Sequence, residues 1–179
     1  MIRIELLSDK NFCEESLDLY NRRQDVKKVY RMIDGKYELI ECEYTEDWDL
    51  NKKRSVAKRI SSDDCITYLA LEDNKVVGFI GMLKKLNCNY MILDMMHVSS
   101  ECRGKGIGRQ LFNLGKEEAR KAGADGMYIS ACSSEETIAF YKAMGSKLAE
   151  HPIKEIAEDE PFDLQMICPI DKTSHAQRA

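Results

Sequence analysis

The sequence predicts a mixed α/β (α+β) domain in which a central sheet is flanked by helices. Three patterns lead to this prediction. An apolar stretch at 89–98 precedes a glycine-rich turn and an amphipathic helix from Ile107, which is typical of a buried strand, a turn and a helix. Two β-rich runs, 65–71 and 76–83, flank a turn-forming segment and predict a hairpin. A further helix with an acidic first turn is expected at 135–144.

Length and composition are those of one globular domain, which we assign to residues 1–170, with a polar tail at 171–179. Hydrophobic residues make up 44% of the chain and charged residues 32%. The net charge of −4 argues against a general affinity for nucleic acid, which usually shows as a basic face. No apolar run approaches the length of a membrane span, and the N-terminus lacks a signal-peptide core, so no membrane partner is expected.

The cysteines also restrict the class of protein. Seven are spread along the chain, an odd number without a Cys-x-x-Cys pair. This pattern argues against a disulfide framework and against a structural zinc site. We therefore expect a cytoplasmic protein in a reducing compartment, with no metal site.

Local signals along the first 60 residues predict two strands and two or three helices. A cap residue before a periodic run marks each helix start, and weak alternation marks each strand. The elements expected here are a strand at 2–7, a helix at 11–22 capped by Ser8 or Asp9, an extension of that helix or a second helix at 24–31, a strand at 37–44, and a helix from Asp47 or Asp49 to Ile60.

The remaining elements follow from turn residues and caps. Gly78 and Gly81 inside the second hairpin strand indicate close packing or a bulge. Ser133 or Ser134 can cap the helix that Gly145 closes. The C-terminal elements expected are strands at 127–132, 147–150 and 162–170, with a loop at 155–161.

The glycine-rich turn is the strongest functional signal. Gly104, Gly106 and Gly108 let successive backbone N–H groups point into one concavity and let an anion approach the main chain. A helix N-terminus beside them favours negative charge, and three cations, Arg103, Lys105 and Arg109, surround it. The predicted ligand is a phosphate or pyrophosphate; the alternative is a tight strand-to-helix turn without a ligand.

Two common nucleotide motifs do not fit this turn. A P-loop requires Gly-Lys-Ser/Thr at its end, whereas Gly108 is followed by Arg109. The dinucleotide fingerprint requires a third glycine at position 109, which is again Arg109.

The pattern Arg103-x-x-Gly106-x-Gly108 after a strand ending in Val98 resembles the acetyl-CoA loop of the GNAT superfamily of N-acetyltransferases. The segment 134–145, with Phe-Tyr and a closing glycine, resembles that family's following helix in order and spacing. The resemblance covers 65–145 well and implies a mostly antiparallel sheet of about seven strands, splayed at its centre. Family members often carry Asn where this chain has Ser134, which puts one cofactor hydrogen bond in doubt.

The resemblance further implies acetyl-CoA as cosubstrate. The pyrophosphate would lie on the turn amides, and the pantetheine arm would run beside the central strand, with the Val98 N–H polarising the thioester carbonyl. The cofactor-binding residues implied are Met96, His97, Val98, Arg103, Gly104, Lys105, Gly106, Ile107, Gly108, Arg109 and Ser134.

A base is needed because an alkylamine is protonated at neutral pH. The resemblance points to Asp94 as a base or water-holding group, and strand alternation places it on the face of Met96 and Val98, with His97 on the other. Asp94 could instead bind a substrate cation or a neighbouring backbone group. His97 could relay protons, although a packed histidine is the commoner case.

Tyr141 is the candidate general acid for the departing thiolate, and its alternative role is to fill the core beside Phe140. Cys132 is a conceivable acyl-carrying nucleophile, but no partner base is evident in the sequence. The expected acceptor contacts are Glu41, Glu43, Glu46, Asp47 and Trp48, which would suit a cationic amine, although they could also form a solvated acidic face.

The resulting hypothesis is an acetyl-CoA-dependent N-acetyltransferase that acts on a primary amine of a small molecule or peptide by direct attack. We allow for a homodimer. The alternatives are a non-catalytic CoA-binding sensor or interaction module and a nucleotide-phosphate binder of another fold.

Overall fold

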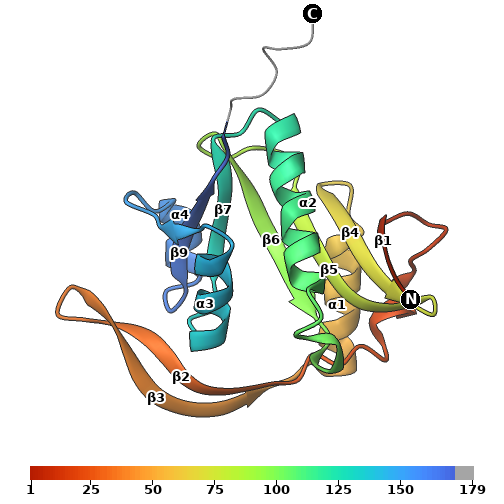
Figure 1. Ribbon diagram of the computed structural model, residues 1–179, viewed down its shortest axis with the longest axis horizontal. Coiled ribbons are helices and arrows are strands. Elements are labelled where there is room, and N and C mark those ends of the chain that lie inside the picture. Colours follow the sequence, from red (N-terminus) through yellow and green to blue (C-terminus); the bar gives the residue numbers. More distant parts are fainter. Residues whose placement is uncertain (172–179) are drawn as a thin grey trace, which may run out of the picture.

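The computed structural model describes residues 1–171 and contains a seven-stranded sheet with strand order β1-β4-β5-β6-β7-β9-β8 (Figure 1). All neighbouring strands are antiparallel except β6 and β7. The strands of this sheet are β1 (Ile2–Leu6), β4 (Cys65–Glu72), β5 (Lys75–Leu83), β6 (Tyr90–Val98), β7 (Gly126–Ala131), β8 (Lys147–Leu148) and β9 (Leu164–Pro169). The predicted fold class is confirmed. The predicted tail lies, from residue 172 onward, outside the described residues.

Helices cover both faces of the sheet. α2 (Ile107–Lys121) packs Leu111, Phe112 and other apolar residues against β5, β6 and β7 on one face (Figure 1). α1 (Leu50–Ile60) lies on the other face, where it forms a second core with β4 and β5. Two further helices are α3 (Glu135–Ala143) and α4 (Lys154–Asp159). Among the described residues, no helix is both long enough and apolar enough to cross a membrane.

The predicted caps explain where α1 and α3 begin. The Asp49 carboxylate accepts a hydrogen bond from the Lys52 N–H at 2.7 Å, which satisfies a free amide of the first turn of α1. The Ser134 hydroxyl accepts from the Thr137 N–H at 3.4 Å at the start of α3.

The N-terminal third corrects the sequence analysis. Residues 24–31 are not helical but form most of β2 (Gln24–Ile33), which pairs with β3 (Lys36–Glu46) in a separate hairpin. The expected helix at 11–22 is reduced to one 3₁₀ turn, Glu14–Leu17. Figure 1 shows the hairpin curving away from the main sheet and passing below α3. The Tyr30 N–H donates to the Ser133 carbonyl at 2.8 Å, so β2 is held by a contact far along the chain.

Two smaller corrections concern the C-terminal part. The segment 155–161, expected as a loop, contains most of α4. The strand expected at 147–150 shortens to β8. Together with β9, these elements form the side of the molecule that faces the gap between β6 and β7.

Candidate active site

The central sheet opens between β6 and β7. These two strands pair only over four residues, from Tyr90↔Gly126 to Leu93↔Ile129. From Asp94 onward, β6 is paired with β5 alone among the described strands. A cavity of about 580 Å³ occupies this opening and extends to the glycine turn and α3. The splayed sheet that the resemblance implied is therefore present.

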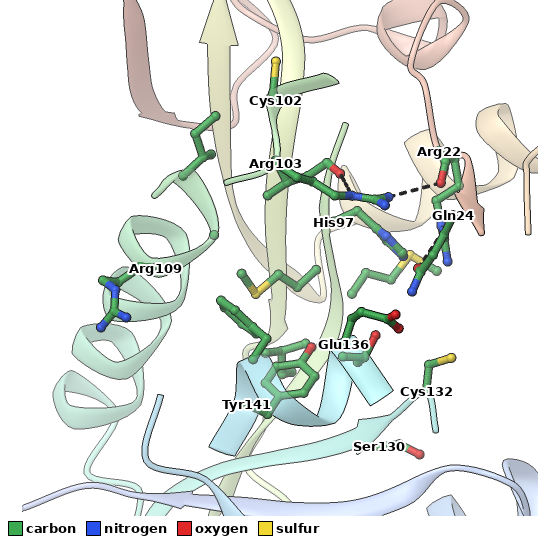
Figure 2. Close-up of a pocket in the computed structure, with 18 of the residues that line it drawn as sticks. Arg22, Gln24, His97, Cys102, Arg103, Arg109, Ser130, Cys132, Glu136 and Tyr141 are labelled. Atoms are coloured by element: carbon green, nitrogen blue, oxygen red, sulfur yellow. Dashed lines mark hydrogen bonds between the residues drawn. The ribbon is translucent and has the colours of Figure 1, made fainter. Parts of the chain in front are cut away.

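The cavity brings together most of the residues singled out in the sequence (Figure 2). Lys105 and Ser134 are the two that do not line it. The predicted site residues that do line it are Asp94, Met96, His97, Val98, Arg103, Gly104, Gly106, Ile107, Gly108, Arg109 and Tyr141.

The glycine turn has the backbone that an anion site requires. Gly104 and Gly106 have φ of +76° and +78°, a left-handed conformation that side chains disfavour, and a Cβ added at either would meet nothing within 4 Å. Gly106 is the N-cap of α2, and no described side chain caps this helix end. The first-turn amides of α2 therefore remain available to a phosphate.

The cations around the turn have different roles. Arg103 does not extend freely into solvent, because its Nε donates to the Val98 carbonyl at 3.0 Å and its Nη2 to the Arg22 carbonyl at 3.4 Å. It thus ties the end of β6 to the start of β2. Burial, and then the neighbouring Arg22 guanidinium, lower the pKa of Arg103. In Figure 2, Arg109 projects from α2 on the side away from His97 and Tyr141.

Tyr141 lies on α3 with its hydroxyl in the cavity (Figure 2). The residue is 7% exposed, and its ring packs against Phe140 and Phe112 with centroids 5.3 and 5.8 Å away. Its hydroxyl has no hydrogen-bond partner among the described residues. Burial, followed by the Cys132 thiol and the Asp163 carboxylate, raises the pKa of Tyr141. Because this unpartnered hydroxyl lies at the cavity, it is available to a ligand.

Asp94 does not lie where strand alternation placed it. The pairing of β5 with β6 passes from Met82↔Leu93 to Gly81↔Met95, so Asp94 is the extra residue of a bulge. Its carboxylate turns to α1 and accepts two hydrogen bonds of 2.8 Å from Arg59. Because α1 lies on the face opposite α2, the prediction that Asp94 shares the face of Met96 and Val98 is wrong. The sequence analysis gives a bulge as one interpretation of Gly81, and the strand pairing has a bulge at this point.

His97 forms part of an aromatic wall. Its ring meets Trp48 edge-on at a centroid distance of 4.8 Å and lies 6.0 Å from the Phe79 ring. Burial, and then the positive charges of Arg22 and Arg103, lower the pKa of His97 to about 3. The imidazole is therefore neutral at physiological pH.

Ser134 has a structural role, and the cofactor contact expected of it stays a prediction. It is fully buried, and its hydroxyl accepts from the Gln24 amide at 3.2 Å and bonds the Thr137 hydroxyl at 2.8 Å while capping α3. These contacts use its hydrogen-bonding capacity, so a contact to a cofactor would have to displace one of them.

The remaining candidates are Cys132 and the five expected acceptor contacts. Cys132 lines it, but burial raises the pKa of its thiol, which disfavours the thiolate that a nucleophile needs. The five expected acceptor contacts do not line it. Glu46 lies behind the lining residue Arg22, to which it is ion-paired at 2.6 Å, and Glu41 pairs with Lys28 on the hairpin surface.

The structure adds carboxylates that the sequence analysis missed. Asp163, Glu160 and Glu136 line the cavity. Asp163 and Glu160 lie in the segment that joins α4 to β9, and the Asp163 N–H donates to the Glu160 carbonyl at 3.1 Å. Only the general acidity of this stretch was visible in the sequence, since its position depends on the pairing of β9 with β7.

A splayed sheet with an anion-binding turn and a buried tyrosine defines an acyltransferase that uses a CoA thioester. The model of the acetyltransferase (GNAT) family matches residues 33–145, and the chain belongs to this family. It is accordingly an acetyltransferase with acetyl-CoA as its cosubstrate. The turn suits this cosubstrate, because its left-handed glycines and uncapped helix end suit a pyrophosphate.

Several solved structures share this fold. Nourseothricin acetyltransferase is 19% identical with a TM-score of 0.71, and the match covers 94% of this chain and 99% of that one. A putative streptothricin acetyltransferase from Bacillus anthracis, in complex with acetyl coenzyme A, is 20% identical with a TM-score of 0.70 and coverages of 96% and 99%. PaiA N-acetyltransferase from Thermoplasma acidophilum, in complex with coenzyme A, is 18% identical with a TM-score of 0.59 and coverages of 94% and 99%. No curated protein matches the sequence.

Proposed function

We propose that this enzyme transfers the acetyl group of acetyl-CoA to a primary amine of a small molecule or peptide by direct attack. The observation that carries the proposal is Tyr141, a buried residue whose hydroxyl has no partner among the described residues and which lines the same cavity as the glycine turn. Besides the Asp94 carboxylate that is paired with Arg59, three carboxylates line the same cavity and favour a cationic acceptor over a neutral alcohol.

Each part of the cavity has a role in this proposal. The amides from Gly104 to Arg109 hold the pyrophosphate, and the backbone of Met96 and Val98, beyond the last β6–β7 pair, lies beside the pantetheine arm. The acetyl group is supplied as an activated thioester. The Val98 N–H polarises its carbonyl, and Tyr141 donates a proton to the departing sulfur.

Asp94 receives a positioning role in the proposal. Both of its carboxylate oxygens are bonded to Arg59, so an incoming ammonium would compete with a bidentate guanidinium. The pair links α1 to the bulge of β6 at the cavity wall. It thereby fixes the part of β6 that precedes the backbone groups assigned to the pantetheine arm.

The test is turnover of acetyl-CoA, followed as thiol release, over a panel of primary amines with the matching alcohols as controls. Acetylation of amines and not of the alcohols of the same carbon skeleton is expected. Preferential acetylation of alcohols, or failure of every amine with correctly folded enzyme, would overturn the amine assignment.

A further inference from the structure

A chain of hydrogen-bonded polar side chains runs through the buried side of β7 and β9 and ends at Ser130. The Tyr128 hydroxyl accepts from the Ile153 N–H at 2.9 Å, so its own hydrogen goes to the Gln165 carbonyl oxygen at 2.8 Å. This bond fixes the orientation of the Gln165 amide, whose nitrogen then donates to the Ser130 hydroxyl at 2.8 Å.

The direction of this chain has a consequence at the cavity. Because Ser130 accepts from Gln165, its own hydrogen is not used in this chain, and the Ser130 hydroxyl acts to lower the pKa of the Asp163 carboxyl. Tyr128 and Gln165 are buried, so the chain is a fixed support for one carboxylate. Asp163 is thereby a positioned group and differs from the exposed acidic residues of α4.

Tyr141 lines the same cavity as Asp163. Asp163 is close enough to Tyr141 to contribute to the pKa of its hydroxyl, and both residues line the cavity. Tyr141 is only 7% exposed and its hydroxyl is unpartnered among the described residues, so the space between them is built to receive a polar ligand.

A second cavity of about 590 Å³ lies beside the opening between β6 and β7, toward α4. It shares Leu93, Asp94, Ser130 and Glu160 with the first cavity, so the two meet at the opening of the sheet. Asp159 and Glu160 line it, and Lys85 is the only cation among the described residues that do so. An acceptor can therefore enter here without crossing the glycine turn.

We propose, building on the proposed amine acetylation, that Asp163 binds the reacting ammonium and takes its proton, and that Glu160 binds a second cation of the same acceptor. The substrate class is thus a diamine or polyamine, or a peptide with a second basic group near the amine. Asp163 is a catalytic residue in this scheme, and Ser130 is a positioning residue.

The step balances without a further reactant. Asp163 takes one proton from the ammonium, and the nitrogen lone pair attacks the thioester carbonyl carbon. A C–N bond forms and the C–S bond breaks. Tyr141 gives its proton to the sulfur and is reprotonated by the second proton that leaves the nitrogen, while Asp163 releases its proton to solvent.

The charge environment of Asp163 suits a base that works near neutrality. Burial, and then the nearby carboxylates Glu160 and Glu46, raise the pKa of Asp163 to about 6, against the opposing effects of Ser130 and Arg31. The titratable and charged groups that face it are Glu160 before β9, Glu46 and Arg31 of the hairpin, Cys132 after β7, and Tyr141 of α3.

The experiment compares Asp163→Asn with Glu155→Gln, an exposed carboxamide substitution on α4 outside both cavities. With cadaverine as acceptor, Asp163→Asn should lower kcat by about 100-fold. It should also abolish the rise of kcat with pH centred near 6, which Glu155→Gln should keep. Equal kcat and equal pH profiles in the two variants would overturn the role of Asp163.

Two further variants test the same proposal where Asp163→Asn does not fold. Asp163→Glu should retain part of the activity. Ser130→Ala removes a hydrogen bond to the ionised carboxylate, so it should move the pH midpoint above 6. An unshifted midpoint in folded Ser130→Ala would contradict the support chain.

The second cation is tested with cadaverine against pentylamine, which has the same carbon chain and one ammonium. The kcat/KM ratio should favour cadaverine by about tenfold and fall toward one in Glu160→Gln. If kcat/KM is the same for pentylamine and cadaverine, the proposed substrate class is wrong, while amine acetylation stands. If no amine is acetylated, the proposed function itself fails, and the inference fails with it.

Discussion

At the scale of single residues, burial determines which protonation states the cavity offers. It raises the pKa of Tyr141, whose hydroxyl therefore keeps its proton at neutral pH and is available as a donor. It lowers the pKa of His97 to about 3, so the imidazole is neutral at neutral pH and is too weak a base to take up a proton there. The relay considered for His97 is therefore disfavoured, and Tyr141 remains the group suited to protonate a thiolate.

The first prediction concerns that proton. Tyr141→Phe keeps the ring that packs on Phe112 and Phe140 and removes a hydroxyl that makes no hydrogen bond within the described residues. We expect kcat to fall by about 100-fold because the general acid is lost. The dissociation constant for CoA, measured by calorimetry, and the melting temperature should change little.

Tyr30→Phe is the matched control, since Tyr30 is a half-buried hairpin residue that does not line the cavity. It should keep the kcat of the unmodified enzyme. Unchanged turnover in Tyr141→Phe would remove the acid role and leave Tyr141 as a core residue.

At the scale of secondary structure, sequence patterns predicted the elements that are determined by neighbouring residues. The strand, glycine turn and helix at 90–121 were predicted because buried alternation, turn glycines and helical periodicity agree there. β2 was missed because its stability comes from distant partners. Val26 and Val29 are buried and Tyr30 bonds Ser133, contacts that no window of neighbouring residues reveals.

The candidate site divides in the same way. The anion turn and Tyr141 lie on elements with strong local signals, and their places in the cavity follow from those elements. The direction in which the Asp94 side chain points depends on a one-residue bulge against β5. The surroundings of the Asp163 carboxylate depend on Gln165 and Ser130. Such contacts join distant parts of the chain, so the sequence showed the acidic residues without their positions.

The glycine turn allows a prediction at this scale. Gly106→Ala places a side chain at a φ of +78°, where it should cost about 1 kcal/mol of stability. A Cβ would meet nothing within 4 Å in the free protein, so the fold should survive. The same Cβ would stand where the pyrophosphate approaches the amides, so KM for acetyl-CoA should rise by about tenfold or more in steady-state kinetics.

Gly123 provides a matched control at the other end of α2. Its φ is +72°, a Cβ there would also meet nothing within 4 Å, and it does not line the cavity. Gly123→Ala should therefore lower the melting temperature by a similar amount without changing KM. A parallel rise of KM in both variants would mean that the loss comes from helix strain and not from the binding turn.

At the scale of the whole molecule, two half-buried titratable groups of the cavity act on stability in opposite directions. The pKa of Asp163 is raised from 3.8 to about 6, so its contribution to stability is fully present below 3.8 and is lost as pH rises through 6. The pKa of His97 is lowered from 6.5 to about 3, so its contribution is present above 6.5 and is lost as pH falls through 3. Between about 4 and 6 the two effects oppose each other.

Removing either group should therefore expose the effect of the other group on the free energy of unfolding. In His97→Phe, an aromatic ring still meets Trp48 and Phe79, and the free energy of unfolding from urea titrations should fall less steeply with acidification than in the unmodified protein. In Asp163→Asn the free energy of unfolding should fall more steeply over the same range. Of the two groups, only His97 then remains, and it takes up a proton on unfolding. His151→Gln, at an exposed position, should leave the curve unchanged. Slopes that change in the same direction in His97→Phe and Asp163→Asn would contradict the opposed pKa shifts of these groups, because a cavity that disfavours both charges must make one slope shallower and the other steeper.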